Sequence, residues 1–241
     1  MNTVAIRKHP VSEHPYFVGA ALAIAAIIFA GFAPSYYLRA WFDTHSLPLL
    51  VQVHGFIMTA WVALFVTQVL LAARRRIPLH RRLGALGAIL AVLIVVVGMM
   101  TLIAAATREV HANSHSPQAA FFLMLLCFNT VDLLVFATLV TGAILLRKRG
   151  DWHKRLMLLA TASLLGPALA RLPLSFFDSN VHALYVMYAC ILLCAIIDTA
   201  RHRRLHPVFA WGAPSIIVIF HVTFLVAATP AWMNLARMLI A

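Results

Sequence analysis

The feature that most constrains the fold is a series of seven long apolar stretches. A helix needs about 20 residues to cross the hydrocarbon core of a membrane, and each stretch is long enough or nearly so. None alternates apolar with polar residues as the strands of a membrane barrel do. We therefore expect an all-α membrane bundle of seven transmembrane helices. The predicted spans are 16–34, 47–73, 83–106, 119–146, 156–173, 181–200 and 208–228.

Composition supports this class, because 63% of the residues are hydrophobic and the mean hydropathy is +0.92. Too little polar surface is left to coat a soluble globule of this length. The first span runs on into Tyr36, Tyr37 and Trp41, an aromatic belt typical of a membrane interface, and we expect it to stay in the membrane. No linker or polar module divides the chain, so residues 1–241 are predicted to form a single transmembrane domain.

Lysines and arginines predict the orientation, because they gather in loops on the cytoplasmic side. Most of the 19 precede the first span or lie between the second and third, the fourth and fifth, and the sixth and seventh spans. Arg39, Arg108 and Arg237 lie on the other side. The N-terminus is thus predicted inside and the C-terminus outside, in the inner (plasma) membrane of a bacterium.

The three inner loops are similar to one another: RRRIPLHRRLG, RKRGDWHKRLM and RHRRLHPV. Each places a histidine at the start of the next helix, which indicates a weak three-fold repeat of helical hairpins. Arginine at a helix start is unfavourable unless an anion is nearby, and phosphates of anionic inner-leaflet lipids would supply one. We expect a lipid-phosphate collar; basic composition of any bacterial inner loop is the alternative. The collar residues are His80, Arg81, Arg82, His153, Lys154, Arg155 and His206.

The large positive charge therefore indicates anionic membrane lipid as a partner. Nucleic acid is excluded, since no polar module exists that could cradle a duplex.

Polar groups inside a membrane are costly and are commonly functional. His54 in the second span and His221 in the seventh are predicted to lie at similar depth in the outer half. If their helices are neighbours, the two imidazoles could ligate haem b, with copper as the less favoured metal. Arg171 and His182 fall at the same outer end, where a haem propionate or another anion would need a cation. Helix packing and snorkelling toward head groups are the alternatives for these residues, and the protein could then hold no cofactor.

Asn129 and Asp132 lie one turn apart in the fourth span. They could serve as a proton or ion station or form a hydrogen bond between helices. Asp198 lies three residues before Arg201, which predicts a local ion pair. Gly166 and Pro167 form the most evident break within a span, just before Arg171.

The segments PLHRRLG and DWHKRLM resemble motifs of small bacterial multi-pass membrane proteins of unknown function. HKRLM also resembles the CtaM-like family implicated in cytochrome oxidase assembly, and the outward histidines are similar to those of membrane b-type cytochromes. These likenesses cover about residues 47–173. They imply a respiratory-chain or assembly partner.

Two functions are compatible with these patterns. The first is a redox or metal-related membrane protein that holds haem near the outer face through His54 and His221. The second is a cofactor-free carrier, or a lipid-binding assembly factor, whose outer polar cluster binds an anion or a lipid head group. The sequence contains no recognisable constellation of catalytic residues, and it neither predicts nor excludes an enzymatic activity.

Overall fold

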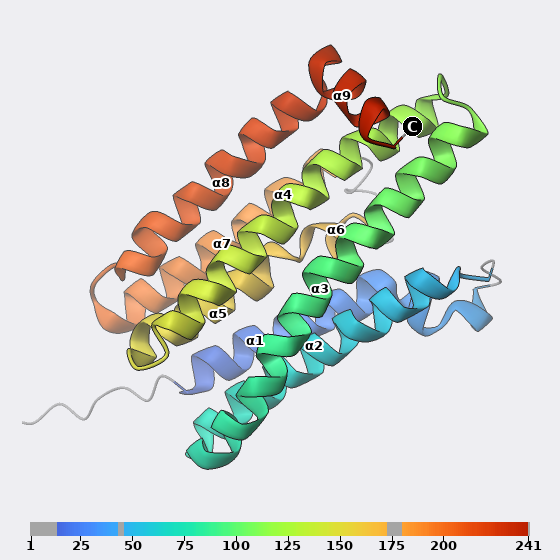
Figure 1. Ribbon diagram of the computed structural model, residues 1–241. Helices are drawn as coiled ribbons and strands as arrows, with labels where there is room; N and C mark the ends of the chain where they lie inside the picture. The colour runs from blue at the N-terminus through green and yellow to red at the C-terminus, as the bar shows by residue number, and fades with distance from the viewer. Residues whose placement is uncertain (1–13, 43–45, 173–179, 241) are drawn as a thin grey trace, which may run out of the picture.

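The computed structural model describes residues 14–42, 46–172 and 180–240, and within these ranges the regular structure is entirely helical. Long helices run side by side between two ends of one bundle (Figure 1). Six of them are long and apolar enough to span a membrane. They are α1 (His14–Phe32), which continues into a π-helix at Ala33–Tyr37, α2 (Leu49–Ala73), α3 (Ile77–Ala112), α4 (Pro117–Leu145), α7 (Asn180–His202) and α8 (Pro207–Ala227).

The fifth predicted span, residues 156–173, is not one continuous helix. α5 (Gly150–Ser163) ends early and is followed by the short α6 (Gly166–Leu169). Pro167 explains the break, because proline lacks the amide hydrogen that would bond to the carbonyl of Ser163, and its ring crowds that carbonyl. The chain nevertheless continues beyond the break, and α6 packs on α1. Residue 173 lies outside the described residues.

The core is built around α4, the most buried of the spanning helices. α4 packs against α3, α5 and α8, while α1 packs against α2 and α6. Aromatic rings of α4 also contact α2, where Phe136 meets Trp61, and α8, where Phe128 meets Phe220. Large apolar residues on the outward faces, such as Phe56 on α2 and Val92 on α3, are exposed as lipid-facing residues would be.

A short amphipathic helix, α9 (Pro230–Ile240), was not expected from the sequence. It lies against the ends of α3 and α4 (Figure 1). The indole nitrogen of Trp232 donates to the backbone oxygen of Leu123 at 2.9 Å, and Ala236 is fully buried there. A short 3-10 helix, Arg39–Trp41, follows the π-helix at the end of α1.

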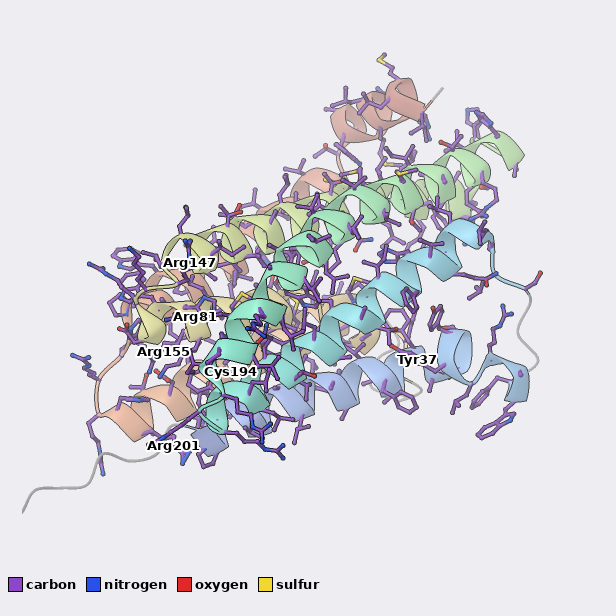
Figure 2. All side chains as sticks on the ribbon, turned by 60° about the horizontal axis from the view of Figure 1, so that its bottom comes forward. Tyr37, Arg81, Arg147, Arg155, Cys194 and Arg201 are labelled. Atoms are coloured by element: carbon purple, nitrogen blue, oxygen red, sulfur yellow. The ribbon has the colours of Figure 1, made fainter. Side chains whose placement is uncertain are left out.

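Charge is distributed unevenly along the bundle. Arg81, Arg147, Arg155 and Arg201 lie at one end, here called the basic end, and Tyr37 lies at the opposite end, here called the Tyr37 end (Figure 2). The prediction that the inner loops share one side is consistent with this arrangement. Which end faces the cytoplasm stays a prediction, as do the seven spans and the three-fold repeat.

Candidate functional site

At the Tyr37 end, two tyrosines hold the π-helix against α2. Tyr36 donates from its hydroxyl to the backbone oxygen of Gln52 at 3.1 Å, and its ring lies directly over Gly55. A side chain at position 55 would occupy the space of that ring, so glycine is required for this approach. Thr59 donates its own hydroxyl proton to the Gly55 carbonyl, so the 3.0 Å bond between Tyr37 and Thr59 has tyrosine as donor. The π-helix is thereby held against α2 at Gly55, the residue that follows His54.

Arg171 is placed at this end by α6. The backbone carbonyl of Ala168 touches Gly31 so closely that a Cβ atom at position 31 would overlap it. Two residues after α6, the Arg171 guanidinium lies 4.9 Å from the centre of the Phe32 ring and donates to the backbone oxygen of Pro167 at 2.7 Å. No carboxylate among the described residues pairs with Arg171. Arg171 is exposed, so an anion from outside the protein can reach its guanidinium.

His54 is half-buried on α2 and lies close enough to Arg171 for the two side chains to interact electrostatically. Its ring faces α3, where the Cβ of a residue at position 98 would lie 3.7 Å from His54 Cε1. The Nδ1 atom is buried and has no hydrogen-bond partner among the described residues. His54 and Arg171, both predicted to lie in the outer half, thus interact electrostatically; their role as a binding site stays a prediction.

The other two predicted members of the outer cluster lie elsewhere. His221 is exposed on α8, on a face turned away from the neighbours of that helix, and α2 and α8 do not pack as a helix pair. The structure therefore does not bring His54 and His221 together as two ligands of one metal. His182, at the start of α7, is exposed. No group of three or more histidine, cysteine or acidic residues within the described ranges is arranged to hold a metal ion.

Asp132 is buried in the core of the bundle, whereas Asn129 is half-buried. Asp132 shares a helix face with Phe128 and Phe136, which lie one turn away on either side and contact α8 and α2. Its Oδ1 atom has no hydrogen-bond partner in the described part of the chain. A bond between Asn129 and Asp132 is not observed.

The basic end contains a buried ion pair that the sequence did not reveal. Arg155 of α5 forms a two-point contact with Asp198 of α7, with Nε to Oδ2 at 2.9 Å and Nη2 to Oδ1 at 2.8 Å. Arg155 is 2% exposed and Asp198 is 0% exposed. The predicted pairing of Asp198 with Arg201 is therefore wrong. The true partners are 43 positions apart in the sequence, so no local spacing could predict their contact.

His206 is also buried, at 5% exposed, and it caps α8. Its Nδ1 accepts from the backbone amide of Val208 at 3.2 Å, and its Nε2 donates to Asp151 at 3.3 Å. Burial lowers the pKa of His206, although Asp151 opposes this. Burial raises the pKa of Asp151, but the hydrogen bond from His206 and backbone bonds lower it more, so its net pKa lies below the ordinary value.

The predicted lipid-phosphate collar is therefore wrong for Arg155 and His206, because both are buried and held by protein groups. Arg81 and Arg82 are exposed, as the collar requires. Lys154 is half-buried with its ammonium 5.0 Å from the centre of the Phe17 ring. Burial, and then Arg155, lower its pKa to about 8.

His80 and His153 turn back toward the helix that precedes each of them. His80 Nδ1 donates to the backbone oxygen of Gln68 at 3.3 Å, and His153 Nδ1 donates to that of Ala143 at 2.8 Å. Their rings meet edge to face with centres 6.2 Å apart. In two of the three similar loops, a histidine thus bonds back to a backbone carbonyl in the last turns of the preceding helix.

The bundle of apolar helices defines the class of this molecule as a multi-pass helical membrane protein. The chain matches no family model, no curated protein and no solved structure. The likeness to the CtaM-like family and to membrane b-type cytochromes stays a prediction.

Proposed function

We propose that this integral membrane protein binds the anionic head group of an amphiphilic molecule at its Tyr37 end. The observation that carries the proposal is the electrostatic interaction between Arg171 and His54, two groups that can bind an anion, while no carboxylate of the described residues pairs with Arg171. An anion that bridges them would balance the guanidinium charge and could accept a hydrogen bond from the imidazole.

An open cleft of about 300 Å³ lies at the same end of the bundle. Its lining combines a cation with polar and aromatic side chains: Tyr36, Tyr37, Arg39, Leu47 and Gln52. Tyr36 belongs both to the cleft and to the contact over Gly55, the residue after His54. Phe29 and Phe56, on the helices that flank this end, are each at least half exposed. A head group in the cleft would therefore have apolar surface beside it for its hydrocarbon part.

The test uses purified protein in a neutral detergent and two short-chain lipids, dioctanoyl phosphatidylglycerol and dioctanoyl phosphatidylcholine, with affinity measured by titration calorimetry. We expect the anionic lipid to bind more tightly, and Arg171→Gln to weaken its binding about tenfold, because hydrogen bonds to charged groups contribute about 1.5–3 kcal/mol. Arg108→Gln is the matched control, since Arg108 is exposed and its guanidinium lies beside Glu109. Equal binding of both lipids, or equal loss in the control, would overturn the proposal.

A second candidate is haem b bound at the same end. It is favoured by one observation, the buried and unpartnered Nδ1 of His54 beside a guanidinium, since histidine and arginine are the residue types that hold haem iron and a propionate. His221 would not supply a second ligand. A respiratory-chain or assembly partner would accompany this function.

The visible spectrum of protein from haem-supplied cells, oxidised and dithionite-reduced, separates the two candidates. A Soret band that His54→Ala abolishes and His221→Ala leaves intact would favour haem. Metal analysis of the same sample tests copper. A colourless, metal-free sample that binds phosphatidylglycerol supports head-group binding.

A further inference from the structure

The buried polar atoms without a hydrogen-bond partner among the described residues include His54 Nδ1, Trp61 Nε1 and Asp132 Oδ1. His54 and Trp61 are seven residues apart on α2 and so lie on the same face. Buried polar groups are nearly always satisfied, and each exception calls for a physical explanation. Here the unpartnered groups come from two different helices, α2 and α4, so one shared role could explain them together.

The packing around α3 places these atoms in one region. The same point on α3, Gly98, is approached by His54 of α2 and by Leu133 of α4, the residue after Asp132. One turn from Asp132 toward the basic end, Phe136 meets Trp61 with ring centres 5.0 Å apart. His54 and Leu133 therefore approach each other at Gly98, and Trp61 meets Phe136 one turn from Asp132, so α2 comes close to α4 beside Asp132.

Asp132 is 5% exposed, and the helix neighbours on its face, Phe128 and Phe136, are apolar. No lysine or arginine of the described residues pairs with it. A carboxylate in such surroundings would pay a large desolvation cost without an opposite charge to offset it, whereas the neutral acid would not. The buried pair at the basic end shows the contrast, since Asp198 is equally buried but has Arg155 as its partner.

We propose that Asp132 is a proton-binding site inside the membrane and that protons reach it from the Tyr37 end through His54. His54 accepts a proton on one ring nitrogen and releases the proton held on the other. In one exchange, neutral Asp132 gives its proton to the unprotonated ring nitrogen of His54 while the other nitrogen releases its proton to water, and the reverse transfers then return a proton from water to the carboxylate. Asp132 is neutral before and after the exchange, and no net charge is left in the bundle. Water at the Tyr37 end is the donor and the final acceptor.

This inference goes beyond head-group binding and does not depend on it. It shares only His54 with the proposed lipid site and makes no use of Arg171. Failure of phosphatidylglycerol to bind would leave the proton site unaffected, and failure of the proton experiment would leave lipid binding unaffected.

The test is infrared spectroscopy of the full chain reconstituted in phosphatidylcholine vesicles at neutral pH. We expect a C=O band of a protonated carboxylic acid that shifts when H2O is replaced by D2O and that is missing in Asp132→Asn. Asp151→Asn, which removes an exposed carboxyl at the basic end, is the control and keeps the band. Absence of such a band in the wild type, or its persistence in Asp132→Asn, would overturn the proposal.

The route is tested by the rate at which the band shifts after transfer to D2O. His54→Gln should slow the shift by about 100-fold, the low end of what a positioned proton-transfer group contributes. Folding of each variant is checked by its helical circular dichroism and by retention of the Asp132 band. A folded His54→Gln protein that exchanges as fast as the wild type would show that His54 is not on the route and would overturn that part of the proposal.

Discussion

Among single residues, Asp198 has the clearest energetic role. Its carboxylate is fully buried and receives two hydrogen bonds from Arg155. Asp198→Ala should lower the free energy of unfolding by about 3–5 kcal/mol, because the arginine is left as an uncompensated buried charge. Thermal unfolding in detergent measures this. The double variant Arg155→Met, Asp198→Leu should recover most of the loss, and equal instability of both proteins would contradict the argument.

His206 makes stability depend on pH. Its Nδ1 accepts the Val208 amide proton, so the imidazole caps α8 only while that nitrogen is unprotonated. Because burial lowers the pKa of His206 in the folded state, stability is fully present above the unfolded value of about 6.5 and is lost as pH falls through the lower folded value. His206→Asn should keep a cap on α8, because asparagine is a favoured N-cap residue. The melting temperature of this variant should therefore change less than that of the wild type between pH 7 and pH 5, a range within about two units of the unfolded pKa. An unchanged curve would assign the pH dependence to other groups.

At the scale of elements, the approach of α6 to α1 positions Arg171. The Ala168 carbonyl fills the space that a side chain at Gly31 would need. Gly31→Ala should therefore cost about 1–3 kcal/mol of unfolding free energy and should weaken the binding of dioctanoyl phosphatidylglycerol, because α6 must move away. Gly19→Ala on the same helix is the control, since its Cβ would meet no atom within 4 Å. Equal melting temperatures and affinities of the two variants would contradict this role of Gly31.

Six helices could be predicted from the sequence because an apolar run of spanning length has few alternatives. Gly166 and Pro167 indicated a break in the fifth predicted span. The span was nevertheless drawn across them, because the apolar run continues on both sides. α9 was missed because its apolar residues lie on one face of only 11 residues, too few for a span.

The site was less predictable, since it depends on which helices are neighbours. Arg171 and His54 were predicted in the outer half and interact electrostatically, whereas His221 of the same predicted cluster lies on the outward face of α8. Hydropathy gives the depth of a residue in the membrane but not the direction of its side chain around the helix axis. For the same reason, Arg155 was mistaken for a lipid-facing residue.

For the whole molecule, the separation of charge predicts a fixed orientation, with the basic end in the cytoplasm. In a variant without the three native cysteines, Arg81→Cys should be protected from a membrane-impermeant maleimide in intact spheroplasts and labelled after lysis. Arg108→Cys should be labelled in both. Both positions are exposed. The reverse pattern would place the N-terminus outside.

The length of α3 has a consequence for the bilayer itself. Its 36 residues extend about 54 Å, against a hydrocarbon core of about 30 Å. Tilt within the usual range of up to about 40° cannot absorb this excess, so the helix must project beyond the core, and α9 packs on its final turns around Ala106. A thicker bilayer would submerge the charged pair Arg108 and Glu109 that follows. Hydrophobic mismatch therefore favours membranes thin enough to leave that pair in water.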